Sequence, residues 1–208
     1  VVYCDFRSGD AFTLVMLSNK DVACPGAKAT WDKAINANIV TSSGYDTCQM
    51  PSSKSELNTI SMMVGLKHWN ILGDTLMIEM GNSHTDITER ASTHVGGFSL
   101  DNAANFKLTL KTMCPENGAA VPGIFQNNGS GRKFTTFDAD HDTRSTAGDE
   151  NCANKYNKAP WWYTSCWSGS MWGGCGQSSH GMKPFWLSSN QPNSRTHAAI
   201  WLRKSRFA

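Results

Sequence analysis

The feature that most constrains this fold is the irregular texture of the C-terminal half of the sequence. After Met113, Gly, Asn, Ser, Pro and Trp dominate, and no long periodic pattern returns until an apolar run at residues 198–202. Long segments without regular secondary structure are uncommon in compact domains unless they are functional or cross-linked. We therefore expect cysteine bridges and a bound metal ion to supply order that secondary structure does not.

The N-terminal half, in contrast, carries patterns typical of strands. Compact or alternating apolar runs, separated by Gly, Asn and Asp turns, predict mostly antiparallel strands. These strands are expected at residues 12–17, 76–80, 93–100 and 106–110, with a closing strand at 198–202.

Two short helices are expected among the strands. Residues 27–39 predict one helix, with Trp31 and Ile35 on one face. A capping-box pattern at residues 52–56 predicts another. Its apolar face would be formed by Leu57, Ile60, Met63 and Val64. The strands and helices together indicate the α+β class.

The length and composition are typical of one globular domain. The chain has 208 residues, of which 39% are hydrophobic and 17% are charged. We expect a single domain over residues 1–208. In it, about 1–112 form a sheet and helix part and about 113–208 form the loop-rich part.

The charge and hydropathy patterns exclude two classes of partner. The net charge is +2 and the basic residues are scattered, whereas nucleic-acid binding needs a basic stripe. No apolar run approaches the length of about 20 residues that spans a membrane. The opening Val1-Val2-Tyr3-Cys4 reads like the interior of a domain, so we expect any signal peptide to have been removed or to lie outside this sequence.

The cysteines predict an oxidising compartment. Seven are present, and none form the C-x-x-C units of a structural zinc site. Asn128 begins a glycosylation sequon, which agrees with secretion. Because seven is odd, at least one thiol is free or joins another chain. We therefore expect a homo-oligomer, and a disulfide bond between protomers is one way to link it.

A run of alternating carboxylates, Asp138-Ala139-Asp140-His141-Asp142, is typical of a cation site. Oxygen ligands in an irregular loop suit Ca²⁺, which takes about six to eight of them, better than Mg²⁺ or zinc. The alternative interpretation is a solvated acidic turn.

An EF-hand is not expected at this loop. Thr143 stands where that loop needs glycine, and Asp149 stands where it needs a bidentate Glu. The preceding residues 133–137 predict a strand rather than a helix.

The sequence does not predict an enzyme. It contains no H-E-x-x-H, G-x-S-x-G or P-loop motif, and its six histidines do not cluster. Cysteines that are mostly bridged would be poor nucleophiles.

Three segments together resemble the C-terminal part of a fibrinogen-like domain: residues 134–140, Asn151-Cys152-Ala153 and residues 161–166. Ficolins, tachylectin-5-type lectins, molluscan sialic-acid-binding lectins and tenascin ends belong to this family. The resemblance covers most of the sequence, with residues 18–70 poorly matched. It implies a central, mostly antiparallel sheet, short helices and a C-terminal part, about 113–208, that is stabilised by a disulfide and calcium and binds the ligand.

The resemblance also implies a calcium site. Its ligands would be the side chains of Asp140 and Asp142 and the backbone carbonyls of Arg144 and Thr146. Asp138 would stabilise the loop without binding the ion. The run from residue 144 to 151 is longer than is usual in the family.

A disulfide between Cys152 and Cys166 is implied in the same way, and would contribute ~3 kcal/mol. The peptide bond between Ser165 and Cys166 is expected to be cis, as in relatives. It would turn the N–H groups of Cys166 and Trp167 toward a bound acceptor. Cys175 is expected to pair with Cys114, Cys48 or another subunit. Cys4 is expected to pair with Cys24 or Cys48 or to link two chains.

The implied ligand is an acetamido group, whose carbonyl accepts these hydrogen bonds and whose methyl enters an aromatic cage. Trp161 and Trp162 are expected in the core, and Trp167 and Trp172 as exposed contacts. Trp167 replaces a histidine common in relatives, which indicates a remodelled pocket. The expected ligand-binding residues are Tyr163, Ser165, Cys166, Trp167, Trp172, His180, Phe185 and Trp186.

The expected function is that of a secreted lectin for N-acetylated sugars, either sialic acid or N-acetylhexosamines, in innate defence or agglutination. The alternative is a protein-binding fibrinogen-like module of an extracellular matrix or clotting-type protein. Residues 161–181 contain no Asp or Glu, which disfavours a peptide ammonium and leaves an anionic sugar acceptable.

Overall fold

The structure is a computed structural model that describes residues 3–7, 9–19, 29–41, 53–116, 130–145, 148, 151–166, 169–172, 185–188, 191–194 and 196–205. Within these ranges, no helix is long and apolar enough to cross a membrane.

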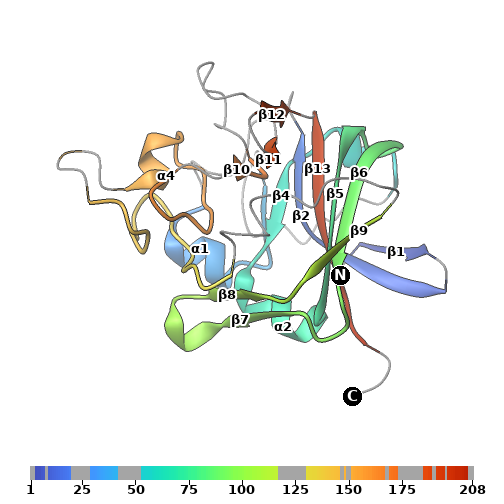
Figure 1. The fold of residues 1–208 in the computed structure, drawn as a ribbon, viewed down its shortest axis with the longest axis horizontal. Coiled ribbons are helices and arrows are strands. Elements are labelled where there is room, and N and C mark those ends of the chain that lie inside the picture. The colour runs from blue at the N-terminus through green and yellow to red at the C-terminus, as the bar shows by residue number, and fades with distance from the viewer. Residues whose placement is uncertain are drawn as a thin grey trace.

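A large antiparallel sheet dominates the fold (Figure 1). Its strand order is β3-β4-β2-β13-β5-β6-β9, and β1 pairs with β2 outside this path. This confirms the predicted antiparallel architecture. The strands are β1 (Cys4–Arg7), β2 (Asp10–Asn19), β3 (Ile39–Thr41), β4 (Met62–Val64), β5 (Thr75–Ser83), β6 (Asp86–Thr93), β9 (Met113–Glu116) and β13 (His197–Arg203).

The closing strand β13 lies in the middle of this sheet, between β2 and β5. Its residues 198–202 are completely buried, and the facing residues of β2 and β5 are buried as well, except the partly buried Thr13 opposite Leu202. A strand covered on both faces reads as a continuous apolar run instead of an alternating one. The predictions of strands at 12–17, 76–80 and 198–202 are confirmed.

The strand predicted at residues 93–100 is wrong, because the backbone turns within it. Thr93 ends β6, and Phe98 begins β7 (Phe98–Asp101), which pairs with β8 (Lys107–Leu110). Gly96 has a φ of 66°, and the N–H of Gly97 donates to the carbonyl of His94 (2.9 Å). Glycine adopts this left-handed conformation without steric cost, so the turn separates two sheets.

The first predicted helix is confirmed in shortened form as α1 (Trp31–Asn36), whose N-cap Thr30 accepts the N–H of Lys33. The second is wrong. The segment forms only the 3₁₀ turn η2 (Glu56–Asn58), and the side chain of its N-cap residue Ser55 makes no capping hydrogen bond. The apolar residues that follow form the buried strand β4, which lies between β2 and β3 in the sheet. The other helical segments are η3 (Leu66–His68), α2 (Trp69–Leu72), η4 (Asn102–Ala104) and α4 (Cys152–Lys155).

An aromatic core supports the irregular C-terminal part. Trp161 and Trp162 are buried, as predicted. The ring of Trp162 packs against Trp69 and Phe134, and its indole N–H donates to the carbonyl of Phe106 (2.8 Å). Side-chain packing from distant segments therefore holds this part. Between β9 and β13, its described strands are the short β10 (Gly169–Ser170), β11 (Phe185–Ser188) and β12 (Gln191–Ser194).

Candidate functional site

Two isolated β-bridges precede the carboxylate loop, at the place where a strand was predicted over residues 133–137. Thr135 pairs with Trp161, and Thr136 pairs with Ala139. The strand prediction is wrong because the backbone turns back at residues 137–138, so no ladder extends beyond these two bridges.

Asp138 stabilises the loop by binding to α1. Its Oδ1 atom accepts the backbone N–H of Trp31 (2.9 Å) and the hydroxyl of Thr136 (2.7 Å). Trp31 is the first residue of α1, so this carboxylate satisfies one of the N–H groups that a helix start leaves open. The predicted stabilising role of Asp138 is thus supported by contacts that sequence spacing could not reveal.

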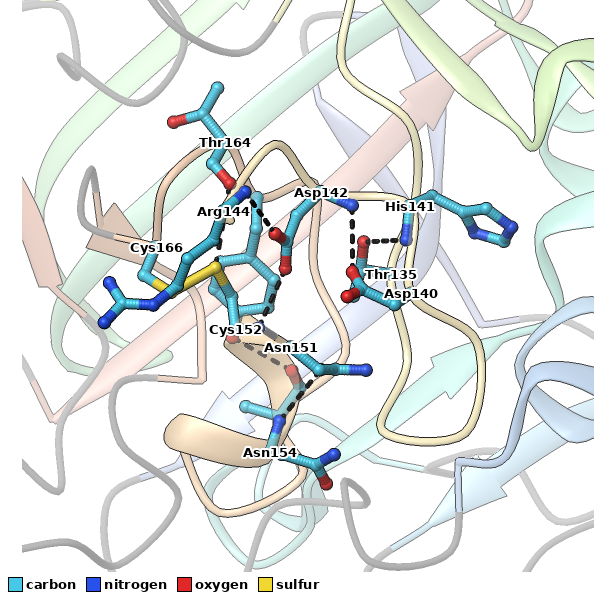
Figure 2. The surroundings of a disulfide bond; sticks show 12 residues. Thr135, Asp140, His141, Asp142, Arg144, Asn151, Cys152, Asn154, Thr164 and Cys166 are labelled. Carbon is cyan, nitrogen blue, oxygen red and sulfur yellow. Dashed lines mark hydrogen bonds between the residues drawn. A yellow bond between two sulfur atoms is a disulfide. The ribbon is translucent and has the colours of Figure 1, made fainter. Parts of the chain in front are cut away.

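Asp140 and Asp142 lie together at the centre of the loop (Figure 2). Oδ1 of Asp140 accepts the N–H of Asp142 (3.1 Å). The two oxygens of Asp142 accept the N–H groups of Arg144 and Cys152, each at 2.8 Å. Burial raises the pKa of Asp142, the two backbone hydrogen bonds oppose that rise, and the charge of Asp140 adds to it. A cation placed between the carboxylates would offset this repulsion.

The donor set at this loop fits calcium better than zinc. In the described part of the protein, no three His, Cys, Asp or Glu residues come close enough to hold a metal ion. The two carboxylates are hard oxygen donors, and backbone carbonyls and water complete calcium sites of irregular loops. Of the predicted carbonyl donors, Arg144 lies in the loop beside Asp142, and Thr146 lies outside the described residues.

The predicted disulfide between Cys152 and Cys166 is confirmed, with a Cα–Cα distance of 5.0 Å. Cys152 begins α4, whose N-cap is Asn151. The Asn151 amide group accepts the N–H of Asn154 (3.0 Å) and donates to the carbonyl of Thr136 (2.9 Å). The sequence analysis named Asn151 only as part of the family resemblance and did not predict its capping role, although Asn directly before a short helix is a typical capping signal.

The peptide bond between Ser165 and Cys166 is trans, so the predicted cis bond is wrong. The described residues contain no cis peptide bond. Cys166 instead has a φ of 80°, and this left-handed conformation redirects the backbone. It costs a non-glycine residue about 1–3 kcal/mol and tends to occur at functional sites. Ser165 is exposed and Cys166 is buried, so the turn lies where the protein surface meets the disulfide.

Two predicted pocket aromatics are buried. Trp172 is 2% exposed, so its predicted exposure is wrong. Burial of a large indole is favourable because the gain grows with the apolar area removed from water. Tyr163 is buried too, donates its hydroxyl to the carbonyl of Ala159 (2.9 Å) and stacks on Tyr156.

Strand pairing joins β11, which carries the predicted ligand-binding residues Phe185 and Trp186, to the strand that follows the turn at Ser165 and Cys166. Gly169 pairs with Trp186, and Ser170 pairs with Phe185. Strand β10 begins three residues after Cys166, so β11 lies beside the first described strand after the disulfide. Trp167, His180 and the sequon residue Asn128 lie outside the described residues.

The remaining cysteines bear on oligomer formation. Cys4 and Cys114 are free thiols. Cys24, Cys48 and Cys175, the intramolecular partners predicted for them, lie outside the described residues.

One family model matches more than half of the sequence. Residues 55–196 match the family described as fibrinogen beta and gamma chains, C-terminal globular domain. A search of curated proteins found no match by sequence.

Solved structures with the same fold include the fibrinogen-like globe domain of human ANGPTL2, with a TM-score of 0.67 and 19% identity over 98% of this chain and 85% of that chain. The corresponding domain of human ANGPTL6 has a TM-score of 0.66 and 20% identity over 99% and 83% of the two chains. Lamprey fibrin D-dimer in complex with the peptide Gly-His-Arg-Pro-amide has a TM-score of 0.65 and 14% identity, over 98% of this chain and 64% of that chain.

Proposed function

Because this protein belongs to the family of C-terminal globular domains of fibrinogen beta and gamma chains, we propose that it is a secreted, non-enzymatic lectin for N-acetylated sugars. Sialic acid and N-acetylhexosamines are the proposed ligand class. Residues 1–208 form one domain in this proposal, and binding takes place in its loop-rich C-terminal part.

The observation that carries the proposal is the turn at Ser165 and Cys166. The left-handed Cys166 is held by the disulfide, and the carbonyl of the preceding Thr164 accepts the N–H of Thr143 (3.0 Å). A backbone segment that is held from both sides can present N–H groups in a fixed direction, at little entropic cost on binding. An acetamido carbonyl is an acceptor that suits such donors.

Calcium has a structural role in this proposal. Asp140 and Asp142 would hold the ion with the carbonyls of Arg144 and Thr146, at a loop that Asp142 joins to Cys152 by a hydrogen bond. The ion would offset the repulsion between the two carboxylates and keep the loop folded. The sugar would contact the neighbouring turn, and not the ion.

The proposed sugar site has aromatic and polar groups beside the turn. Ser165, Cys166 and Trp167 would supply polar contacts to the sugar, and the indole ring of Trp167 would supply an aromatic contact. Phe185 and Trp186 are proposed as further contacts because β11 pairs with the strand that follows the turn. Tyr163 and Trp172 would shape the site from the buried side, and His180 would border it.

A protein-binding module is the second candidate, because the lamprey fibrin relative was solved with a bound peptide. That peptide, Gly-His-Arg-Pro-amide, carries a guanidinium group, and burying such a cation needs a carboxylate partner. Residues 161–181 of the present sequence include no Asp or Glu. The charge therefore favours a neutral or anionic ligand.

A glycan array on the purified protein, run with calcium and with chelator, tests the proposal. We expect binding confined to N-acetylated sugars, and weaker binding after chelation. Asp140→Ala should weaken binding without changing the order of preferred sugars, whereas Asp32→Ala, an exposed acid on α1, should not weaken it. A blank array with folded, calcium-loaded protein would reject the lectin and favour the protein-binding module.

Assembly into a homo-oligomer is part of the proposal. A single lectin site is weak, and several sites on one particle multiply the apparent affinity. The free thiols of Cys4 and Cys114 are available for a bond between protomers. Agglutination of cells by the oligomer, lost after mild reduction, would support this assembly and a role in innate defence.

A further inference from the structure

A cavity of about 280 Å³ lies between the N-terminal hairpin and the main sheet. Its walls come from β1, the segment before η2, strand β5, the β5–β6 turn and β6. None of its lining residues belongs to the carboxylate loop or to the disulfide region. Figure 1 shows β1 and β6 on the opposite side of the molecule from α4.

Two arginines meet a buried carboxylate at the floor of this cavity. Glu79 on β5 is completely buried. Arg7 binds both of its oxygens, with Nη2 at 3.1 Å from Oε2, and Nε of Arg90 lies 2.8 Å from Oε1. The Arg7 guanidinium also packs over the ring of Trp201, 4.9 Å from its centroid. The charge of Glu79 is therefore fully compensated before any ligand arrives.

The charge that faces solvent in the cavity is positive. The side chains of Lys54, Arg90 and Arg7 are 64%, 29% and 21% exposed. Of the two lining acids, Asp5 is 12% exposed and Glu79 is not exposed. Three bases and two acids leave a net charge of +1 on the lining, and its accessible side is basic.

Polar groups of the cavity wall remain able to form hydrogen bonds with a bound ligand. Arg7 uses three N–H groups on Asp5 and Glu79, of the five that a guanidinium carries. His84 also lines the cavity, and its buried Nδ1 atom has no hydrogen-bond partner among the described residues. Buried polar atoms normally have a partner, so the wall is incompletely satisfied.

An aromatic ring stands beside these basic groups. Phe6 on β1 lines the cavity and is 78% exposed, which is unusual for so large an apolar residue. Exposed aromatic rings pack against the C–H surface of sugars, while charged groups near them set the orientation. A cavity of this size admits one small group and not a whole protein segment.

We propose that this cavity is a second binding site, which takes a sulfate or carboxylate group carried on a sugar. Arg7, Arg90 and Lys54 bind the anion, and Phe6 packs on the sugar ring. Glu116 on β9 lies 3.4 Å from Nη1 of Arg90 and competes with the ligand for that guanidinium. The site does not depend on the calcium loop, so it stands whether or not the lectin proposal holds.

Isothermal titration of the 208-residue protein with three probes tests this site: a sulfated disaccharide, a carboxylated disaccharide without sulfate, and their uncharged parent. We expect the charged probes to bind, the parent not to bind, and binding to weaken with added salt because the partners are partly exposed charges. The relative affinities of the two charged probes identify which anion the site prefers. Asp140→Ala should leave this binding unchanged, which separates it from the calcium loop.

Variants of exposed residues locate the site without disturbing the buried network. Lys54→Ala should weaken binding up to about fivefold, the value of one exposed ion pair. Phe6→Ser should weaken the binding of disaccharides but not that of inorganic sulfate. Glu116→Gln should strengthen the binding of all anions. Lys67→Ala removes the same charge from an exposed position outside the cavity and should have no effect. Equal binding by wild type, Lys54→Ala and Phe6→Ser would overturn the proposal, as would charged probes that fail to bind the folded protein.

Discussion

Oδ2 of Asp142 accepts the backbone N–H of Cys152 at 2.8 Å, which joins the carboxylate loop to the first residue of α4 and to the disulfide (Figure 2). The same carboxylate accepts the N–H of Arg144 through its other oxygen. One residue therefore fixes the loop, the helix start and the cross-link in a single geometry. A change in the loop is expected to reach the turn at Ser165 and Cys166 through this contact.

We expect Asp142→Ala to destabilise the fold by about 2 kcal/mol, because two backbone N–H groups lose their acceptor. Calcium removal should lower the free energy of unfolding of the wild type and have no further effect on this variant. Urea unfolding with and without chelator measures both effects. Asp32→Ala is the control, since that exposed acid accepts a hydrogen bond from Asn36 of its own helix. An undiminished response of Asp142→Ala to calcium would contradict the proposed ion site.

Loss of the disulfide should cost about 3 kcal/mol, because the bond restricts the unfolded protein between residues 152 and 166. Cys166→Ala tests this by equilibrium unfolding in urea. Cys4→Ser, at an exposed free thiol, should leave the free energy of unfolding unchanged. If both variants unfold at the same urea concentration as the wild type, the bond has no stabilising role.

Asp138→Ala should loosen the start of α1, because the N–H of Trp31 and the hydroxyl of Thr136 lose their shared acceptor. The expected cost is about 1 kcal/mol, the usual value of a lost helix cap. Hydrogen exchange at the Trp31 amide should speed up in this variant. Asp138→Asn keeps an acceptor oxygen and should restore most of the protection. Unchanged exchange in Asp138→Ala would show that the contact does not hold the helix.

Stability should fall in mild acid because of His197. Burial lowers the pKa of this histidine from 6.5 to about 4, with the neighbouring His84 adding to the effect and Glu79 opposing it. Between these values the unfolded state binds a proton that the folded state does not. The stability contribution is therefore complete above pH 6.5 and is lost as the pH falls toward 4. The loss amounts to about 3 kcal/mol.

Urea unfolding at several pH values checks this prediction with His197→Gln, which removes the titrating group. That variant should show a flatter pH dependence between pH 6.5 and 4 than the wild type. His94→Gln, at an exposed histidine, should keep the wild-type slope. If His197→Gln retains the full slope, other groups cause the acid sensitivity.

Sequence alone identified the elements whose pattern is local. Compact apolar runs marked β2 and β13, because strands covered on both faces need no polar side, and an alternating pattern marked β5. Trp31 and Ile35 marked α1 by their helical spacing, and the order of rare motifs in the C-terminal half indicated the family and the bond between Cys152 and Cys166. These signals lie within a few residues of each other or in a fixed order along the sequence.

Tertiary structure decided what depends on distant partners. Residues 62–64 form β4 and not a helix because β2 and β3 lie on either side of them. Trp172 is buried although it stands among Gly and Ser residues, and the contact of Asp138 with Trp31 spans 107 positions. The network of Arg7, Glu79 and Arg90 likewise follows from the packing of the β1 hairpin against the sheet. Burial and ion pairing are properties of the packed molecule, whereas propensity and periodicity are properties of a short segment, and only the latter are readable from sequence.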